Sequence, residues 1–173
     1  GDQFVMGESI GEALKRAEQA QGEKFNYSFD MLGEAAMTGA DAEQYIHAYE
    51  QAIHAIGTVS ANRGVYEADG ISIKLSALHP RYEVAQTDRV WQELYPVLKH
   101  LALLARHYDI GLNIDAEEAA RLELSLDLFE QLCFEPELTD WYGLGIVVQA
   151  YQKRSLAVID YLIDLAKRSD RRI

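Results

Sequence analysis

The chain has 173 residues, of which 49% are hydrophobic, and a formal net charge of −12 at pH 7. This length can bury a hydrophobic core, so we expect one domain over residues 1–173. This net negative charge disfavours binding to the phosphate backbone of nucleic acids, so we expect no nucleic-acid binding by this segment. No apolar run reaches the roughly 18 residues that a transmembrane helix needs, and no signal peptide is visible.

One cysteine, Cys133, lies within a helical pattern. Because it has no second cysteine with which to form a disulfide within the chain, a reducing compartment is the simplest interpretation. We therefore expect Cys133 to fill space in a helix and the protein to be cytoplasmic.

In chain order, a short amphipathic helix is expected at about 9–20. After it, a short β-type run, a polar loop and a long helical pattern follow one another four times. The predicted strands are 25–32, 70–78, 110–115 and 143–151, and the predicted helices are 41–63, 88–109, 116–134 and 156–170. Thr87 and Ser155 are predicted N-caps, and Pro96 is expected to kink the second long helix.

Strand–loop–helix units repeated in this way predict a parallel sheet with right-handed crossovers. The two candidate architectures are an open doubly wound sheet and a closed (βα)8 barrel. No G-x-G-x-x-G follows any predicted strand, which disfavours the dinucleotide-binding form of the open sheet. Four units are half of eight, so we expect an α/β fold that comprises about the first four βα units of a TIM-type barrel.

Apolar and polar residues alternate along the predicted strands, most clearly in ISIKLSAL, residues 71–78. In a barrel the more apolar parity faces the helices and the other parity faces the interior. The predicted helix-facing set is Tyr27, Phe29, Met31, Ile71, Ile73, Leu75, Leu112, Ile114, Ile146 and Val148. The predicted inward-facing set is Ser28, Asp30, Ser72, Lys74, Ser76, Asn113, Asp115, Val147 and Gln149. Each strand thus places a polar group near its C-terminal end, where barrels keep their active sites.

The lysine in the second strand is the sharpest functional signal. A lone ammonium inside a barrel is costly unless it is paired, so Lys74 should pair with Asp30 and Asp115 from the flanking strands. Three alternatives stay open: a buried ion pair without chemistry, a Lys74 that faces solvent, and a Lys74 that forms a Schiff base with a carbonyl substrate.

Other polar residues carry weaker signals. The amide of Gln149 suits an amide-like or pyrimidine edge, and equally an internal hydrogen bond. His79, before Pro80, is expected to be a turn residue. Glu117 and Glu118 are expected in the first turn of a helix, where the helix dipole favours carboxylates.

No metal or nucleophile motif is visible. The spacing of His, Cys and Asp residues matches no zinc or iron site, and no G-x-S-x-G is present. His47 and His54 lie seven residues apart in a predicted helix and are expected to serve packing or the surface.

The chain contains four blocks in this order: YSFDMLGEAA, ISIKLSALHPRY, NIDAEE and QAYQKR. In these blocks, and over nearly all of its length, the chain resembles the proline dehydrogenase domain of the bifunctional proline utilization A (PutA) flavoenzymes. The resemblance implies a distorted (βα)8 barrel that binds FAD noncovalently and oxidises L-proline to Δ1-pyrroline-5-carboxylate. It also implies that the electrons pass to a membrane quinone, with peripheral membrane association, and that a second domain oxidises the hydrolysed product to glutamate with NAD.

The same resemblance implies roles for residues at matching positions. Lys74 matches a lysine that contacts the proline carboxylate, and Asp115 matches an active-site aspartate. Val147 and Gln149 match residues that line the flavin ring.

Two further positions, Asp30 and Tyr151, match residues near the site. In the family, the arginine pair that binds the substrate carboxylate lies later in the domain. Many of the residues that bind the flavin also lie there. The resemblance therefore leaves open a half-barrel that is inactive without its missing half. Oligomeric state and a separate DNA-binding domain, which some relatives possess, are also left open.

Overall fold

The structure is a computed structural model that describes residues 7–20, 26–31, 33 and 35–173. Its described strands form one parallel sheet in the order β1-β2-β3-β4. The strands are β1 (Ser28–Asp30), β2 (Gly70–Ile73), β3 (Leu112–Ile114) and β4 (Leu144–Ile146). Spatial order follows chain order, as predicted for successive βα units. Phe25 and Leu32, the predicted limits of the first strand, lie outside the described residues.

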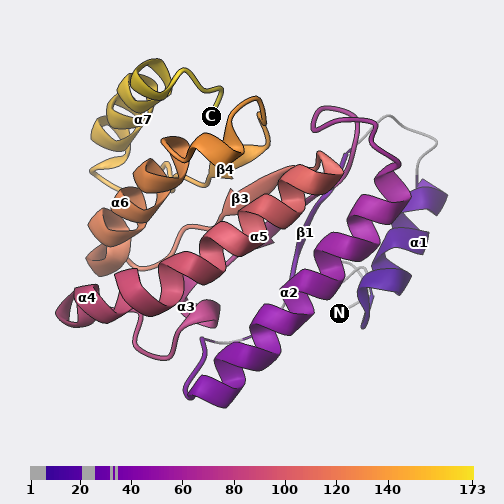
Figure 1. The fold of residues 1–173 in the computed structure, drawn as a ribbon, viewed down its shortest axis with the longest axis horizontal. Helices are drawn as coiled ribbons and strands as arrows, with labels where there is room; N and C mark the ends of the chain where they lie inside the picture. Colours follow the sequence, from indigo (N-terminus) through magenta and orange to yellow (C-terminus); the bar gives the residue numbers. More distant parts are fainter. Residues whose placement is uncertain (1–6, 21–25, 32, 34) are drawn as a thin grey trace.

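Helices connect the strands and cover one face of the sheet. The α-helices are α1 (Ile10–Ala20), α2 (Gly39–Ser60), α3 (Leu75–Leu78), α4 (Thr87–Arg89), α5 (Tyr95–Tyr108), α6 (Leu122–Cys133) and α7 (Ser155–Ser169). Shorter helical turns are η1 (Val84–Gln86), the π-helical η2 (Val90–Leu94), η3 (Ala119–Arg121) and η4 (Pro136–Leu138). Figure 1 shows α2 and α5 side by side in front of the strands. Among the described residues, none of the helices combines the length and apolar character that crossing a membrane requires.

The sheet has one apolar and one polar face, as the alternation predicted. The side chains buried against the helices include Phe29, Ile71, Ile73, Leu112, Ile114 and Leu144. The opposite parity is exposed or half-buried, and the register aligns Asp30, Ser72, Asn113 and Gly145 across the four strands. The hydrophobic core therefore lies between the sheet and the helices, and the polar face is open.

The second strand is shorter than predicted. It ends at Ile73, and after Lys74 the chain turns into the single helical turn of α3. The alternation of Leu75 to Leu78 misled the prediction, because Leu75 and Leu78 also lie three residues apart on one face of a helical turn, and both are buried. Ser76 is therefore not an inward-facing strand residue, and that prediction is wrong; its side chain is buried in α3.

Two predicted N-caps are also wrong. Thr87 and Ser155 are the first residues of their helices, and their hydroxyls donate to the carbonyls of Val84 and Ala150 respectively. A capping box occurs at α2 instead, where Thr38 Oγ1 accepts from the Asp41 amide at 3.1 Å and the Asp41 carboxylate accepts from the Thr38 amide at 2.9 Å.

The predicted disturbance at Pro96 takes the form of a π-helical turn. Pro96 has no N–H to donate, so the regular helical ladder is interrupted at this point. The turn η2 comes immediately before α5, and the Tyr95 amide donates to the Val90 carbonyl five residues earlier.

Cys133 occupies the predicted position inside a helix. It is a free cysteine, buried at the end of α6. Burial raises the pKa of its thiol to about 12, so the thiol stays protonated and unreactive near neutral pH.

Candidate active site

An ion-paired lysine lies at the C-terminal edge of the open face. Lys74 Nζ is 2.7 Å from Asp30 Oδ1 and 3.1 Å from Asp115 Oδ2. Asp30 ends β1, Lys74 follows β2 and Asp115 follows β3, so the parallel register brings the three residues to one edge. The predicted pairing of Lys74 with both flanking carboxylates is confirmed.

The lysine is held in its charged form. Burial works to lower the pKa of Lys74, but the hydrogen bonds and charges of Asp30 and Asp115 outweigh it, and the pKa lies above its ordinary value. A Schiff-base lysine needs an uncharged amine and hence a lowered pKa. The environment of Lys74 therefore favours electrostatic binding over nucleophilic attack.

The backbone at Lys74 is held from two sides. The Lys74 amide donates to Tyr49 Oη at 3.1 Å, and the Ser76 amide donates to Glu117 Oε2 at 3.2 Å. Tyr49 comes from α2 and Glu117 from the loop after β3. The sequence did not predict either contact. The placement of Glu117 and Glu118 in the first turn of a helix is wrong, because both precede η3 and α6 begins only at Leu122.

Polar side chains form the open face beneath the ion pair. The hydroxyls of Ser28 and Ser72 are 2.9 Å apart on β1 and β2. On β4, a Cβ at Gly145 would lie 2.1 Å from Asn113 Oδ1, so the glycine leaves room for the Asn113 side chain. The open face of the strands is thus polar, with Ser28 exposed and Ser72 and Asn113 half-buried.

The loop after β4 carries the predicted flavin-lining residues. Val147 continues the sheet, since its amide donates to the Ile114 carbonyl at 2.9 Å, and its side chain is 43% exposed. Gln149 Oε1 accepts from Tyr151 Oη at 3.2 Å and from Gln152 Nε2. The Gln149 amide is therefore turned toward its own loop.

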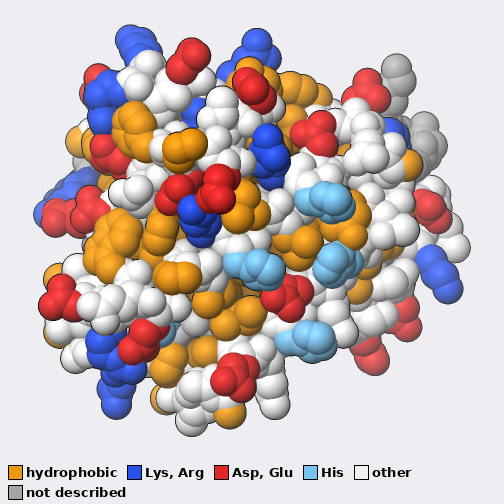
Figure 2. Space-filling view, viewed as in Figure 1, with side chains coloured by type: hydrophobic (Ala, Val, Ile, Leu, Met, Phe, Trp, Pro, Cys, Tyr) orange, Lys and Arg blue, Asp and Glu red, His pale blue; other side chains and the backbone are white. Residues whose placement is uncertain are grey.

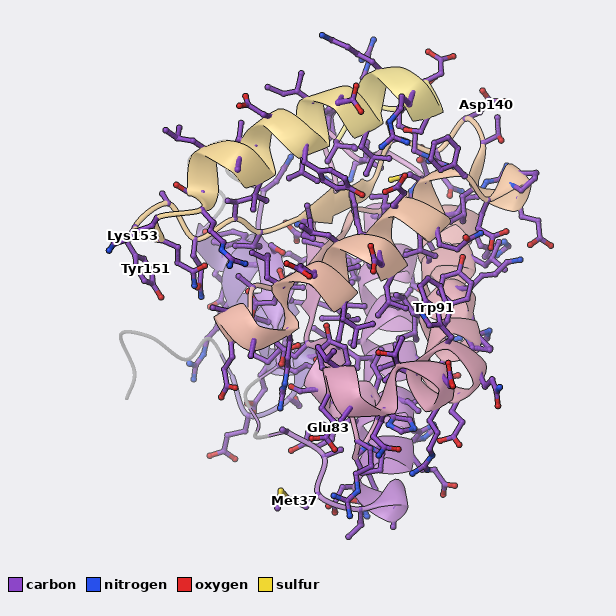
Figure 3. The ribbon with its side chains drawn as sticks, turned by 90° about the vertical axis from the view of Figure 1, so that its left-hand side faces the viewer. Met37, Glu83, Trp91, Asp140, Tyr151 and Lys153 are labelled. Atoms are coloured by element: carbon purple, nitrogen blue, oxygen red, sulfur yellow. The ribbon has the colours of Figure 1, made fainter. Side chains whose placement is uncertain are left out.

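Gln149 and Asp115 line the same cleft, which extends between the starts of α6 and α7. The polar residues along it are Tyr82, Asp115, Glu117, Glu118, Arg121, Ser125, Gln149, Gln152 and Ser155. The Arg121 guanidinium lies over the Tyr82 ring, 5.4 Å from its centre. Tyr151 is 83% exposed, and Figure 3 shows it with Lys153, projecting outward from the loop between β4 and α7.

His79 lies outside this site and fixes a turn, as predicted. Its Nδ1 accepts from the Arg81 amide at 3.0 Å, so Nε2 carries the proton and donates to Glu93 Oε2 at 2.5 Å. Arg89 also contacts Glu93 through two nitrogens at 3.1 Å. The Arg89 guanidinium, with a smaller part from His79, lowers the pKa of Glu93 to about 2.

Other histidines gather on the outer face of α2 and α5, where Figure 2 shows them close together. His54 Nδ1 is 2.6 Å from Tyr108 Oη, and His100 Nε2 is 2.9 Å from Glu50 Oε1. Within the described parts of the chain, no group of three or more His, Cys, Asp or Glu side chains is arranged to hold a metal ion. These contacts belong to helix packing and the surface.

A family model described as proline dehydrogenase matches residues 13–173. The chain belongs to the proline dehydrogenase family. The bifunctional protein PutA of Klebsiella aerogenes is 68% identical over 173 residues, which are 100% of this chain and 13% of that protein. Proline dehydrogenase 1 of Bacillus subtilis (strain 168) is 29% identical over 164 residues, covering 94% of this chain and 48% of that protein.

Solved structures of the family agree with the fold. A Bradyrhizobium japonicum PutA variant superposes with a TM-score of 0.84 at 50% identity, over 97% of this chain and 17% of that one. PutA from Bdellovibrio bacteriovorus, inactivated by N-propargylglycine, superposes with a TM-score of 0.89 at 26% identity, over 98% of this chain and 19% of that one. The sheet is therefore part of a TIM-type proline dehydrogenase barrel, and the chain spans only a small share of these longer relatives.

Proposed function

We propose that this chain forms part of the catalytic barrel of an FAD-dependent enzyme that oxidises L-proline to Δ1-pyrroline-5-carboxylate. The observation that carries the proposal is the protonated Lys74, held by Asp30 and Asp115 on the open face at the C-terminal edge of the sheet. Membership of the proline dehydrogenase family supports the substrate.

Lys74 has one hydrogen-bond donor left for a substrate. An ammonium carries three N–H donors, and Asp30 and Asp115 take one each. The third is available to the carboxylate of an amino acid, which would add charge attraction to the hydrogen bond. We therefore assign Lys74 to binding the proline carboxylate and Asp115 to holding and orienting the Lys74 ammonium. We place Asp30 beside Asp115 in this orienting role.

The residues after β4 fit part of a flavin. Val147 offers exposed aliphatic surface to a planar ring, and the Gln149 amide offers a donor and an acceptor to a pyrimidine edge. To make that contact, Gln149 would exchange its hydrogen bonds with Tyr151 and Gln152 for contacts with the ring. FAD, when bound, supplies the hydride acceptor, and the protein supplies position and charge complementarity.

Oxidation of a secondary amine places modest demands on protein groups. The nitrogen lone pair must be free to form the C=N bond as a hydride leaves the adjacent ring carbon. The task of the chain is then to hold the carboxylate at Lys74 so that this carbon meets the hydride acceptor at a fixed distance and angle. We propose a membrane quinone as the final electron acceptor. The cytoplasmic location and the peripheral membrane contact stay predictions.

The proposal is tested in the complete polypeptide that carries this sequence, loaded with FAD. N-propargylglycine shares with proline a secondary amine next to a carboxylate, and it inactivates the Bdellovibrio relative. We expect proline to reduce the bound flavin, N-propargylglycine to inactivate the enzyme, and proline to slow that inactivation.

Lys74→Met should weaken proline binding about tenfold or more, since one charge-assisted hydrogen bond is lost. Lys99→Met is the matched control, because Lys99 is also 28% exposed and pairs with two carboxylates, Glu135 and Glu137, away from the site. Equal KM values for proline in Lys74→Met and Lys99→Met would refute the role of Lys74. A flavin that proline does not reduce would refute the function.

A further inference from the structure

The direction of the Lys74 side chain depends on how the chain leaves β2. Lys74 stands between the strand and α3 in an extended conformation, with φ −101° and ψ 122°. Its carbonyl accepts from the Ala77 amide at 3.1 Å, which starts the α3 turn. Its amide donates to a side chain, Tyr49 Oη, at 3.1 Å. Two hydrogen bonds therefore constrain the backbone of Lys74, and with it the direction of the Cα–Cβ bond. The carbonyl bonds to Ala77 in α3, and the amide bonds to Tyr49 on the helix-covered side of the sheet.

Tyr49 reaches this amide from the hydrophobic core. It lies on α2 and is 1% exposed, and its hydroxyl is close enough to Lys74, Asp30 and Glu117 to feel their charges. Burial raises the pKa of Tyr49, so the phenol is uncharged and accepts the Lys74 N–H as a neutral group. The Tyr49 ring is therefore packed in the core, and its hydroxyl is hydrogen-bonded to the backbone of the ion-paired lysine.

We propose that Tyr49 is a positioning residue for Lys74. By accepting the Lys74 amide proton, Tyr49 holds the backbone where the ammonium reaches both Asp30 and Asp115 and presents its third donor to the substrate carboxylate. Tyr49 lies behind the sheet and acts only through Lys74. This inference rests on the proposed function and adds a residue from a covering helix to the substrate-binding apparatus.

Tyr49→Phe in the complete, FAD-loaded polypeptide is the direct test. The variant keeps the ring and its packing and removes only the hydroxyl. We expect KM for proline to rise about two- to tenfold, which matches the loss of one net hydrogen bond, with kcat and flavin absorbance unchanged. Tyr108→Phe is the control, because its hydroxyl bonds to His54 on the outer face of the same helix pair. The control should leave KM unchanged.

A double-mutant cycle separates positioning from general loosening. In a Lys74→Met background Tyr49→Phe should have no further effect on KM, because the ammonium that Tyr49 positions is absent. The same fold-change in KM in both backgrounds would overturn the proposal, as would an unchanged KM in Tyr49→Phe.

A readout that does not need proline keeps this result distinct from the proposed function. Hydrogen exchange at the Lys74 amide should be faster in Tyr49→Phe than in Tyr108→Phe or the unmutated protein. Unchanged exchange would refute the contact itself. Faster exchange in a protein that does not oxidise proline would refute the proposed function and, with it, the role of Tyr49 in substrate binding.

Discussion

Lys74 and Lys99 have nearly the same immediate surroundings but lie at different places in the fold. Each ammonium is 28% exposed and lies between two carboxylates, and in each case those carboxylates help raise the lysine pKa. Lys99 sits on the helix α5, whereas Lys74 follows a strand and stands at the edge where parallel strands end. Charge pairing alone therefore does not mark a site. The proposed role of Lys74 rests on the position of its ion pair at the end of the sheet, where barrels of this type keep their active sites.

Glu93 is also held by oppositely charged or hydrogen-bonding partners, but its contacts stabilise a turn and not the candidate site. It accepts from Arg89 on its own helical segment and from His79 in the loop after α3. These contacts favour the charged carboxylate and lower the pKa of Glu93 to about 2, from an ordinary value of 4.5. A carboxylate with a lowered pKa in the folded state stabilises that state above its unfolded pKa and loses the effect as pH falls through its folded pKa.

We therefore predict that Glu93→Gln destabilises the protein at pH 7 and that this destabilisation shrinks between pH 4.5 and pH 2. Urea unfolding at pH 7 and pH 3, compared between variant and unmutated protein, measures the difference. Glu83→Gln is the control, since Glu83 is exposed and its carboxylate forms no hydrogen bond or ion pair with another described residue. A Glu93→Gln effect of equal size at both pH values would contradict the linkage.

At the scale of single elements, the start of α2 carries a complete capping box. Thr38 and Asp41 satisfy two backbone amides reciprocally in front of a 22-residue helix. That helix also supplies Tyr49, whose hydroxyl accepts the Lys74 amide proton.

Replacing the capping hydroxyl should therefore destabilise the fold. We predict that Thr38→Ala lowers the free energy of unfolding by about 1 kcal/mol. Thr87→Ala should cost less, because Thr87 begins its helix without capping it and donates only to the Val84 carbonyl. Urea unfolding of the two variants makes the comparison, and equal losses would show that the Thr38 cap adds nothing.

The elements also show which parts of the site the sequence could predict. Asp30, Lys74 and Asp115 were predictable because strand alternation and parallel order are local signals that place each residue on a face and at an edge. Tyr49 and Glu117 were not, because they meet the β2–α3 junction across 25 and 41 residues of sequence. The end of β2 was missed because alternation over four residues is compatible with both a strand and one helical turn.

At the scale of the whole molecule, the described sheet has two open edges, β1 and β4, and one uncovered polar face. The outer side of α7 adds an apolar stripe, since Leu156, Ile159 and Ile163 are 75%, 41% and 50% exposed at helical spacing. A TIM-type barrel closes by adding strands and helices at such edges. The relatives have the length for this, because the matched region is 13% of the Klebsiella aerogenes protein.

We therefore predict that the 173-residue chain, expressed alone, binds no FAD and self-associates through its open edges. Mixed with the segment that follows the matching region in the Klebsiella aerogenes PutA protein, it should gain flavin absorbance and proline-dependent reduction of a quinone, because the added strands cover β4 and complete the open face. Size-exclusion chromatography and visible absorbance follow both steps. Lys74→Met supplies the control: it should assemble and turn yellow like the unmutated chain but need more proline for turnover. A monomeric, yellow chain without the added segment would show that four βα units suffice to hold the cofactor.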